Sequence, residues 1–126
     1  MYQGGVACAI HVELEHLIYQ ITRIDHRIMK IILQKPNSIK DKPISVIITY
    51  APHSGYSGEE RTKHWKQVKL VLESTPKTHV ILWCTDANGQ LGNRLRTQPE
   101  LAKIIGMNTK AIKQKTETGK HYKTYA

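Results

Sequence analysis

The segment that decides the fold is Pro43–Tyr50, which reads PISVIITY. Its apolar residues are nearly continuous and mostly β-branched, a pattern typical of a strand in the centre of a sheet. The cluster KPNSIKDK at residues 35–42 comes directly before it and predicts a turn, because Pro, Asn, Asp and Ser favour turn conformations. We therefore expect a central strand that starts after this turn and ends at Tyr50.

Three earlier segments are also predicted as strands. They are Gly4–Val12 (GGVACAIHV), Tyr19–Arg23 (YQITR) and Arg27–Leu33 (RIMKIIL). The first is rich in small and β-branched residues and is typical of a buried strand, whereas the second alternates apolar and polar residues. Short loops join these segments, so an antiparallel meander is favoured for this part of the chain.

A helix is predicted after the central strand. Ser57 and Glu60 have the spacing of a capping box, in which Ser57 is the N-cap and the helix runs to about Glu73. One face carries apolar residues and the other carries Lys66 and Glu73, while Leu70 falls on the polar side. The apolar face consists of Trp65, Val68, Val71 and Leu72.

Another strand is predicted after Pro76, at Val80–Cys84 (VILWC). A strand, a helix and a strand in this order predict a β-α-β crossover, in which the two strands are parallel neighbours. The fold class is therefore expected to be α/β. Residues 99–105 are predicted as a short helix.

The composition narrows the class of protein. The 126 residues are enough for one domain, and a hydrophobic content of 40% is typical of globular chains. No apolar run approaches the roughly 18 residues of a membrane span, so an integral membrane protein is excluded and no membrane partner is expected. No signal peptide opens the chain, so we expect an intracellular protein, with the nucleus as one open compartment.

The positive charge is concentrated towards the C-terminus. The formal net charge is +9, with 11 basic and 8 acidic residues in 1–93 and 8 basic and 2 acidic residues in 94–126. A basic excess favours a polyanionic partner such as DNA or another nucleic acid. Residues 107–126 carry little bulky apolar surface, so we expect a loose basic tail after a domain at residues 1–106.

The two cysteines, Cys8 and Cys84, both lie in apolar segments, which predicts buried, reduced thiols and excludes a disulfide scaffold. Neither has a cysteine neighbour, and the seven histidines lack zinc spacing, so no residue is assigned as a metal ligand.

Polar residues follow the two best strands. Tyr50 and His53 lie at the end of the first, and Asp86 and Asn88 follow the second. The carboxyl ends of parallel neighbours lie side by side, so these four residues are candidates for one site. The segment Thr85–Gly89 is also a good turn, because Asp and Asn cap their own backbone and Gly permits positive φ. On spacing alone the turn is favoured over an active site.

These motifs in this order resemble the endonuclease/exonuclease/phosphatase superfamily. They are most similar to the endonuclease domains of LINE-type (non-LTR) retrotransposons and their craniofacial-development-protein-2-like relatives. Tyr50 and Pro52 match the family's Asn/Thr-x-Tyr-x-Pro motif, and Asp86 and Asn88 match its Gly-Asp-Phe/Leu-Asn motif. Thr85 stands where the family usually has Gly. The opening Gly4–Ala7 resembles the strand that follows the family's catalytic glutamate, and a helix with Arg61 and Trp65 lies between the motifs.

The resemblance implies hydrolysis of a phosphodiester with Mg²⁺, in a two-layer β-sandwich flanked by helices. Asp86 would be the base for the attacking water and Asn88 would hold that water or a phosphate oxygen. Tyr50 would donate a hydrogen bond to the scissile phosphate, and His53 would face the substrate. Structural alternatives stay open, in which Tyr50 is a core aromatic residue at a strand end and His53 is a solvent-facing loop residue.

Several groups of the family are missing from the chain. Only Met1, Tyr2 and Gln3 precede the Gly4 segment, where a metal-binding Glu is expected, and no Asp follows Asn88 to form the closing Asp-His pair. The resemblance therefore implies a fragment of the sandwich that is incomplete at both ends, with unpaired sheet edges. Mg²⁺ binding by such a fragment is doubtful, because too few hard oxygen donors remain.

Three functions remain open at this point. The first is a fragment of a metal-dependent nuclease of retrotransposon type, inactive or very weak alone. The second is a non-catalytic basic module that binds nucleic acid through Lys and Arg contacts to phosphates. The third is a phosphatase-type member of the same superfamily. The order of the motifs favours the superfamily, and the charge of +9 favours nucleic acid as the substrate. The sequence leaves the oligomeric state open.

Overall fold

The computed structural model describes residues 4–88, and their elements follow the order η1-β1-β2-β3-α1-β4. The chain divides into two compact units, which we describe separately. Of the described residues, the first contains residues 4–51 and Leu70–Asp86, and the second contains Pro52–Lys69 with Ala87 and Asn88. The bounds are η1 Val12–Leu17, β1 Ile18–Asp25, β2 Ile28–Leu33, β3 Ile44–Tyr50, α1 Gly58–Ser74 and β4 Val80–Asp86.

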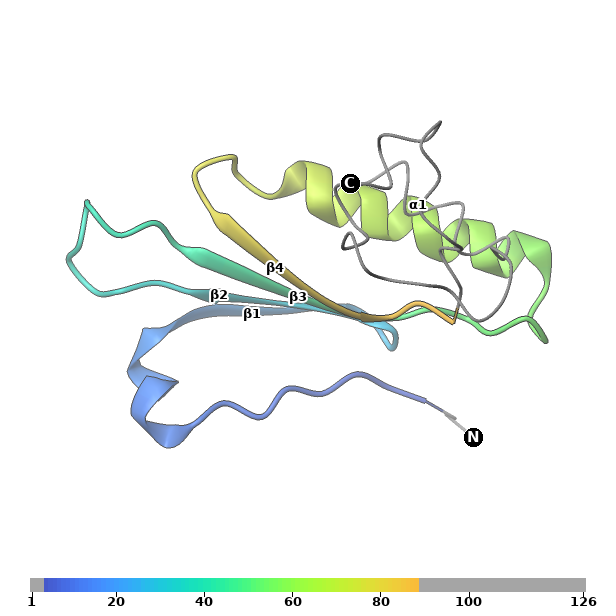
Figure 1. Cartoon of the computed structure of the whole chain (residues 1–126), viewed down its shortest axis with the longest axis horizontal. Coiled ribbons are helices and arrows are strands. Elements are labelled where there is room, and N and C mark those ends of the chain that lie inside the picture. The colour runs from blue at the N-terminus through green and yellow to red at the C-terminus, as the bar shows by residue number, and fades with distance from the viewer. Residues whose placement is uncertain (1–3, 89–126) are drawn as a thin grey trace, which may run out of the picture. The chain divides into compact units, whose positions relative to one another are not determined.

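The first unit is built on one mixed four-stranded sheet with the order β1-β2-β3-β4 (Figure 1). The pairs β1–β2 and β2–β3 are antiparallel, which confirms the predicted meander. The pair β3–β4 is parallel and runs without a register shift from Ile44–Val80 to Tyr50–Asp86. Because α1 lies between β3 and β4 in the chain, the predicted β-α-β connection is also confirmed, and the fold is of the α/β kind.

The two faces of the sheet follow from the register of the strands. Ser45, Ile47 and Thr49 alternate along β3 and are all buried. On this face the Lys30 ammonium donates to Thr75 Oγ1 at 2.9 Å, and its partial burial lowers the Lys30 pKa. The other face carries Ile31, which is buried in the middle, and apolar side chains toward the rims that are about half exposed.

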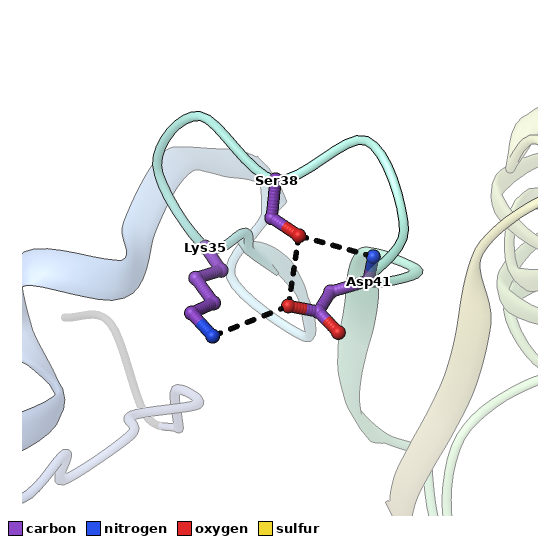
Figure 2. A network of polar contacts seen from close by, with 3 residues as sticks. All are labelled: Lys35, Ser38 and Asp41. Carbon is purple, nitrogen blue, oxygen red and sulfur yellow. Dashed lines mark hydrogen bonds and ion pairs between the residues drawn. The ribbon is translucent and has the colours of Figure 1, made fainter.

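The predicted turn at residues 35–42 joins β2 to β3 and is held by its own polar side chains (Figure 2). The Ser38 hydroxyl donates to Asp41 Oδ2 at 2.9 Å and accepts from the Asp41 backbone N–H at 3.2 Å. The Lys35 ammonium lies 3.4 Å from the same carboxylate oxygen. These contacts favour the charged carboxylate, so the Ser38 hydrogen bond and then the Lys35 charge lower the Asp41 pKa.

The predicted capping box is confirmed at the start of α1. The Glu60 backbone N–H donates to Ser57 Oγ at 3.1 Å, and the Ser57 N–H donates to Glu60 Oε2 at 3.2 Å. The helical faces are also as predicted, since Trp65 and Val68 are buried and Leu70 is 65% exposed. The sequence therefore determined where this helix starts and which of its faces is buried.

The predicted strand at Gly4–Val12 is wrong. Residues 4–11 have no regular secondary structure, and Val12 begins the short 3₁₀ helix η1. Figure 1 shows this segment running outside the sheet before it enters β1. Most of its side chains are Gly, Ala or Cys, which bury too little apolar area to offset the entropy of ordering the chain.

The prediction of buried thiols is also wrong. Cys8 and Cys84 are free cysteines as expected, but both are exposed. Cys8 lies in the irregular N-terminal segment, and Cys84 lies on β4, which is an edge strand of the sheet within the described residues. An apolar sequence such as VILWC therefore did not guarantee a central position.

Some predictions fall outside the described residues. These are the short helix at residues 99–105 and the loose basic tail at residues 107–126. The part of the chain that is described forms one sheet, so the two-layer sandwich remains a proposal. No helix among residues 4–88 is long and apolar enough to cross a membrane.

Replacing the N-cap should weaken the fold measurably. Ser57→Ala removes the hydroxyl that accepts from the Glu60 N–H, so we expect the free energy of unfolding to fall by about 1 kcal/mol. Urea denaturation followed by circular dichroism measures this change. Ser54→Ala is the matched control, because it removes an exposed loop hydroxyl outside the capping box, and its effect should stay within about 0.5 kcal/mol. Equal effects would contradict the capping assignment.

The turn between β2 and β3 makes a pH-dependent prediction. Ser38→Ala removes the largest contribution to the lowered Asp41 pKa, so this pKa should rise toward its ordinary value. In the native protein the contribution of this carboxylate to stability is present above its unfolded pKa and is lost as pH falls through the lower folded pKa. NMR titration of the Asp41 side chain measures the change. A rise is also expected for Lys35→Ala, because its charge and its hydrogen bond both lower this pKa. An unchanged pKa in Ser38→Ala would contradict the contact.

Candidate functional site

The structure brings Tyr50 and Asp86 together. They are register partners at the carboxyl ends of the parallel strands β3 and β4. The Ala51 backbone N–H donates to the Asp86 carbonyl at 2.8 Å, which extends the ladder to the last residue of β4. Because paired residues share a face of a sheet, both side chains project from the same face at the same edge. Tyr50 is half-buried and Asp86 is exposed.

On the opposite face of the sheet, side-chain hydrogen bonds join β3 to β4 near these strand ends. The Thr49 hydroxyl donates to Thr85 Oγ1 at 2.8 Å. Trp83 Nε1 donates to Thr49 Oγ1 at 2.9 Å, and Thr49 itself is only 2% exposed. Thr85, which departs from the Gly of the family motif, therefore has a structural role that Gly lacks. This partly buried polar cluster ties the two strands together one residue before Tyr50 and Asp86.

Arg27 joins the site from the turn between β1 and β2. Its carbonyl accepts from the Tyr50 N–H at 2.9 Å, and its Nη1 donates to the Tyr50 carbonyl at 3.4 Å. The guanidinium carbon lies 5.3 Å from the centroid of the Tyr50 ring, within the range of a cation–π interaction. The Arg27 N–H donates to Asp25 Oδ1 at 2.6 Å, which fixes the turn. Arg27 is only 8% exposed, so it holds the Tyr50 ring from a largely buried position.

His53 belongs to the second unit and has a well-defined local setting there. Its Nδ1 accepts from the Gly55 N–H at 3.0 Å, and its ring meets Tyr56 edge to face at 4.7 Å between centroids. A Cβ on Gly55 would lie 2.7 Å from His53 Cε1, so a larger residue at this position would displace the exposed His53 ring. His53 is exposed, which agrees with its predicted place in a loop.

Asn88, also in the second unit, has the backbone of a turn residue. It is exposed and adopts a positive φ of 46°, a conformation that Asn tolerates better than most residues. This conformation fits the turn predicted from the segment Thr85–Gly89. The two interpretations of the segment are compatible, because a turn directly after β4 also presents polar side chains beyond the strand end.

The donor set at this edge does not by itself fit a protein-held Mg²⁺. Asp86 supplies the only carboxylate among the four predicted site residues, whereas Mg²⁺ requires octahedral oxygen coordination. Among residues 4–88, no group of three or more His, Cys, Asp or Glu side chains is placed to hold a metal ion. The chemistry that this edge can supply by itself is proton acceptance at Asp86 and hydrogen-bond donation from Tyr50.

Comparison of the chain with protein-family models, curated proteins and solved structures finds no match. The resemblance to the superfamily therefore rests on the sequence motifs alone.

Of the predicted site residues, the structure places Tyr50 and Asp86 as neighbours and describes His53 and Asn88 within the other unit. Arg27 was missed by sequence reasoning. Its position becomes evident only from the pairing of Ile28 with Thr49, which places the residue before β2 beside the last residue of β3. The available signal was the short turn Asp25–Arg27. A hairpin of β1 with β2 places this turn at one end of the sheet, and the antiparallel β3 ends there as well.

Removing the Arg27 guanidinium should loosen Tyr50. For Arg27→Met we expect the free energy of unfolding to fall by roughly 1 kcal/mol, because a cation–π contact and a long hydrogen bond are lost. The Tyr50 ring resonances should also shift in an NMR spectrum. Arg23→Met removes an exposed arginine from β1 and should leave both quantities nearly unchanged. Unaltered Tyr50 resonances in Arg27→Met would refute the contact.

Proposed function

We propose that this chain is part of a phosphodiester-cleaving nuclease of the endonuclease/exonuclease/phosphatase superfamily, of retrotransposon type, and that it is a very weak enzyme alone. The observation that carries the proposal is the register pairing of Tyr50 with Asp86 at the carboxyl edge of two parallel strands. This is the edge at which open α/β sheets bind ligands. The two strongest motif residues thus meet, although 35 residues separate them in the sequence.

The proposed reaction is attack by water on a phosphodiester. The Asp86 carboxylate accepts a proton from the water while a new bond forms between the water oxygen and phosphorus. The ester bond on the opposite side of phosphorus breaks, and the departing oxygen takes a proton from solvent. The Tyr50 hydroxyl donates to a non-bridging phosphate oxygen as negative charge develops there. Arg27 is a positioning residue in this proposal, because its contacts hold the Tyr50 ring and backbone.

The weakness of the enzyme follows from the groups around this edge. In the superfamily Mg²⁺ stabilises the charge on the phosphate, but the described residues gather no set of three ligands for it. Loss of members of a catalytic constellation commonly costs several orders of magnitude in rate. Mg²⁺ dependence and the sandwich fold are therefore proposed for the complete enzyme, and no step above depends on the metal.

DNA is the proposed substrate because of the charge. The net charge of +9 would attract a polyanion, and neutralised phosphates release counterions. The distribution of this charge favours the second candidate function, a non-catalytic binding module. Residues 1–93, which contain the motifs, carry only +3 of the net charge of +9, so most of the positive charge lies outside the motif segment. Removal of the Asp86 carboxylate distinguishes a nuclease from a simple binder. It abolishes cleavage by a nuclease, whereas an electrostatic binder does not need an exposed acid for its DNA affinity.

A plasmid-nicking assay with Mg²⁺ tests the proposal. We expect slow nicking, several orders of magnitude below that of a complete nuclease, that disappears in Asp86→Ala. Asp41→Ala is the matched control, since it removes an exposed aspartate from the β2–β3 turn and should nick at the native rate. Nicking that survives in Asp86→Ala, or that never exceeds the blank, would reject the nuclease.

DNA binding by the same two proteins tests the alternative function. If Asp86→Ala binds DNA more tightly than the native chain, with steep salt dependence and no nicking by either protein, the chain is an electrostatic binder. Rapid nicking at rates ordinary for enzymes would instead contradict the proposal that the chain is weak alone.

A further inference from the structure

The turn between β1 and β2 lies at the same end of the sheet as the candidate site. It joins β1, which ends at Asp25, to β2, which begins at Ile28. Because β2 runs antiparallel to β3, it begins where β3 ends, and the Tyr50 N–H donates to the Arg27 carbonyl at 2.9 Å. Figure 1 shows this turn at the end of the sheet where β3 and β4 also end. A ligand that extends from Tyr50 across the sheet toward β1 therefore meets this turn.

Polar contacts hold the backbone of the turn in place. Asp25 Oδ1 accepts from the Arg27 N–H at 2.6 Å, and Arg27 Nη1 donates to the Tyr50 carbonyl at 3.4 Å. Ile28 follows directly and is completely buried. A segment that is fixed in this way presents its outward side chains in set positions, which lowers the cost of ordering them when a ligand binds.

Two side chains of this hairpin remain available to a ligand. Arg23 and His26 are exposed, and among residues 4–88 neither makes a side-chain hydrogen bond, an ion pair or a ring contact. Asp25 and Arg27, on either side of His26, are instead used to hold the turn. A guanidinium is always charged, and an imidazole carries at least one N–H donor in either protonation state. Both groups are suited to contact phosphate oxygens.

The register places Arg23 on the same face of the sheet as Tyr50. Arg23 pairs with Met29, and Met29 pairs with Ile48, which lies two residues before Tyr50 on β3. Strand β1 is two strand spacings from β3, or about 10 Å. A small phosphoester held at Tyr50 is too short to span this separation. Each strand of DNA carries a phosphate about every 3.4 Å along the helix axis, so a polynucleotide reaches both positions.

We propose that Arg23 and His26 bind backbone phosphates of duplex DNA that flank the scissile phosphate, and that the substrate of this edge is therefore a polynucleotide rather than a small phosphoester. The inference rests on the proposed function, because it takes Tyr50 as the residue that contacts the scissile phosphate. The Arg23 guanidinium can donate two parallel hydrogen bonds to one phosphate, and the His26 imidazole donates one. Contacts of this kind position the DNA and do not read its sequence.

The salt dependence of DNA binding tests the role of Arg23. A short labelled duplex is titrated in EDTA, so that no metal-dependent cleavage occurs. For Arg23→Gln we expect the affinity to fall about tenfold and the slope of log affinity against log salt to decrease by about 1, because one phosphate contact is lost. Lys40→Gln is the matched control, since it removes an exposed positive charge from the β2–β3 turn at the opposite end of the sheet and should keep the native slope.

NMR titration of the native chain with the same duplex provides a second measurement. The His26 imidazole and the Tyr50 ring should shift together and saturate at the same DNA concentration. His16 is the matched control, because it is exposed in η1, at the other end of the eight-residue strand β1, and should not shift. His26→Ala should lower the affinity roughly twofold to fivefold, whereas His16→Ala should leave it unchanged.

The outcomes separate this inference from the proposed function. Equal losses in Arg23→Gln and Lys40→Gln, or no DNA binding by the native chain, would overturn the inference. A Tyr50 shift without a His26 shift would also overturn it and leave the proposed site intact. If Arg23 and His26 respond as expected while nicking survives in Asp86→Ala, the proposed function fails and the DNA contact of the hairpin stands.

Discussion

The parallel pairing of β3 with β4 is the contact on which the rest of the structure depends. It joins two apolar segments that are separated in the chain by α1, and it continues without a shift to Tyr50 and Asp86. A parallel pair requires a long connection, so its formation commits the whole segment between the strands to a crossover. The partly buried cluster of Thr49, Thr85 and Trp83 adds directional hydrogen bonds to this pairing near its carboxyl end. The register is therefore specified by polar groups as well as by apolar burial.

That register also sets the position of the candidate site. It aligns Tyr50 with Asp86, the two residues on which the proposed function rests. Each of them follows its own apolar segment in the sequence, and only the pairing of β3 with β4 makes them neighbours.

The contrast between Arg27 and the predicted residues shows how a site is completed by tertiary structure. Tyr50 and Asp86 stand out in the sequence because they follow apolar strands. Arg27 carries no such signal, since its neighbours are ordinary turn residues. It becomes part of the site only because β2 pairs antiparallel with β3 and returns its first turn to the carboxyl end of that strand. A residue of this kind is visible only after the strand order is known.

The sequence by itself determined the local elements with strong signals. These are the capping box at Ser57, the faces of α1 and the turn at residues 35–42, because each depends on contacts within a few residues. Three of the four predicted strands upstream of the helix were also found, because the apolar pattern of a strand is local even though its pairing is not. Tertiary structure decided the rest. The segment Gly4–Val12 has strand-like composition but lies outside the sheet, and VILWC lies at its edge with an exposed thiol. Whether an apolar segment is central, at an edge or unpaired depends on which other strands bury it, and that information is not local.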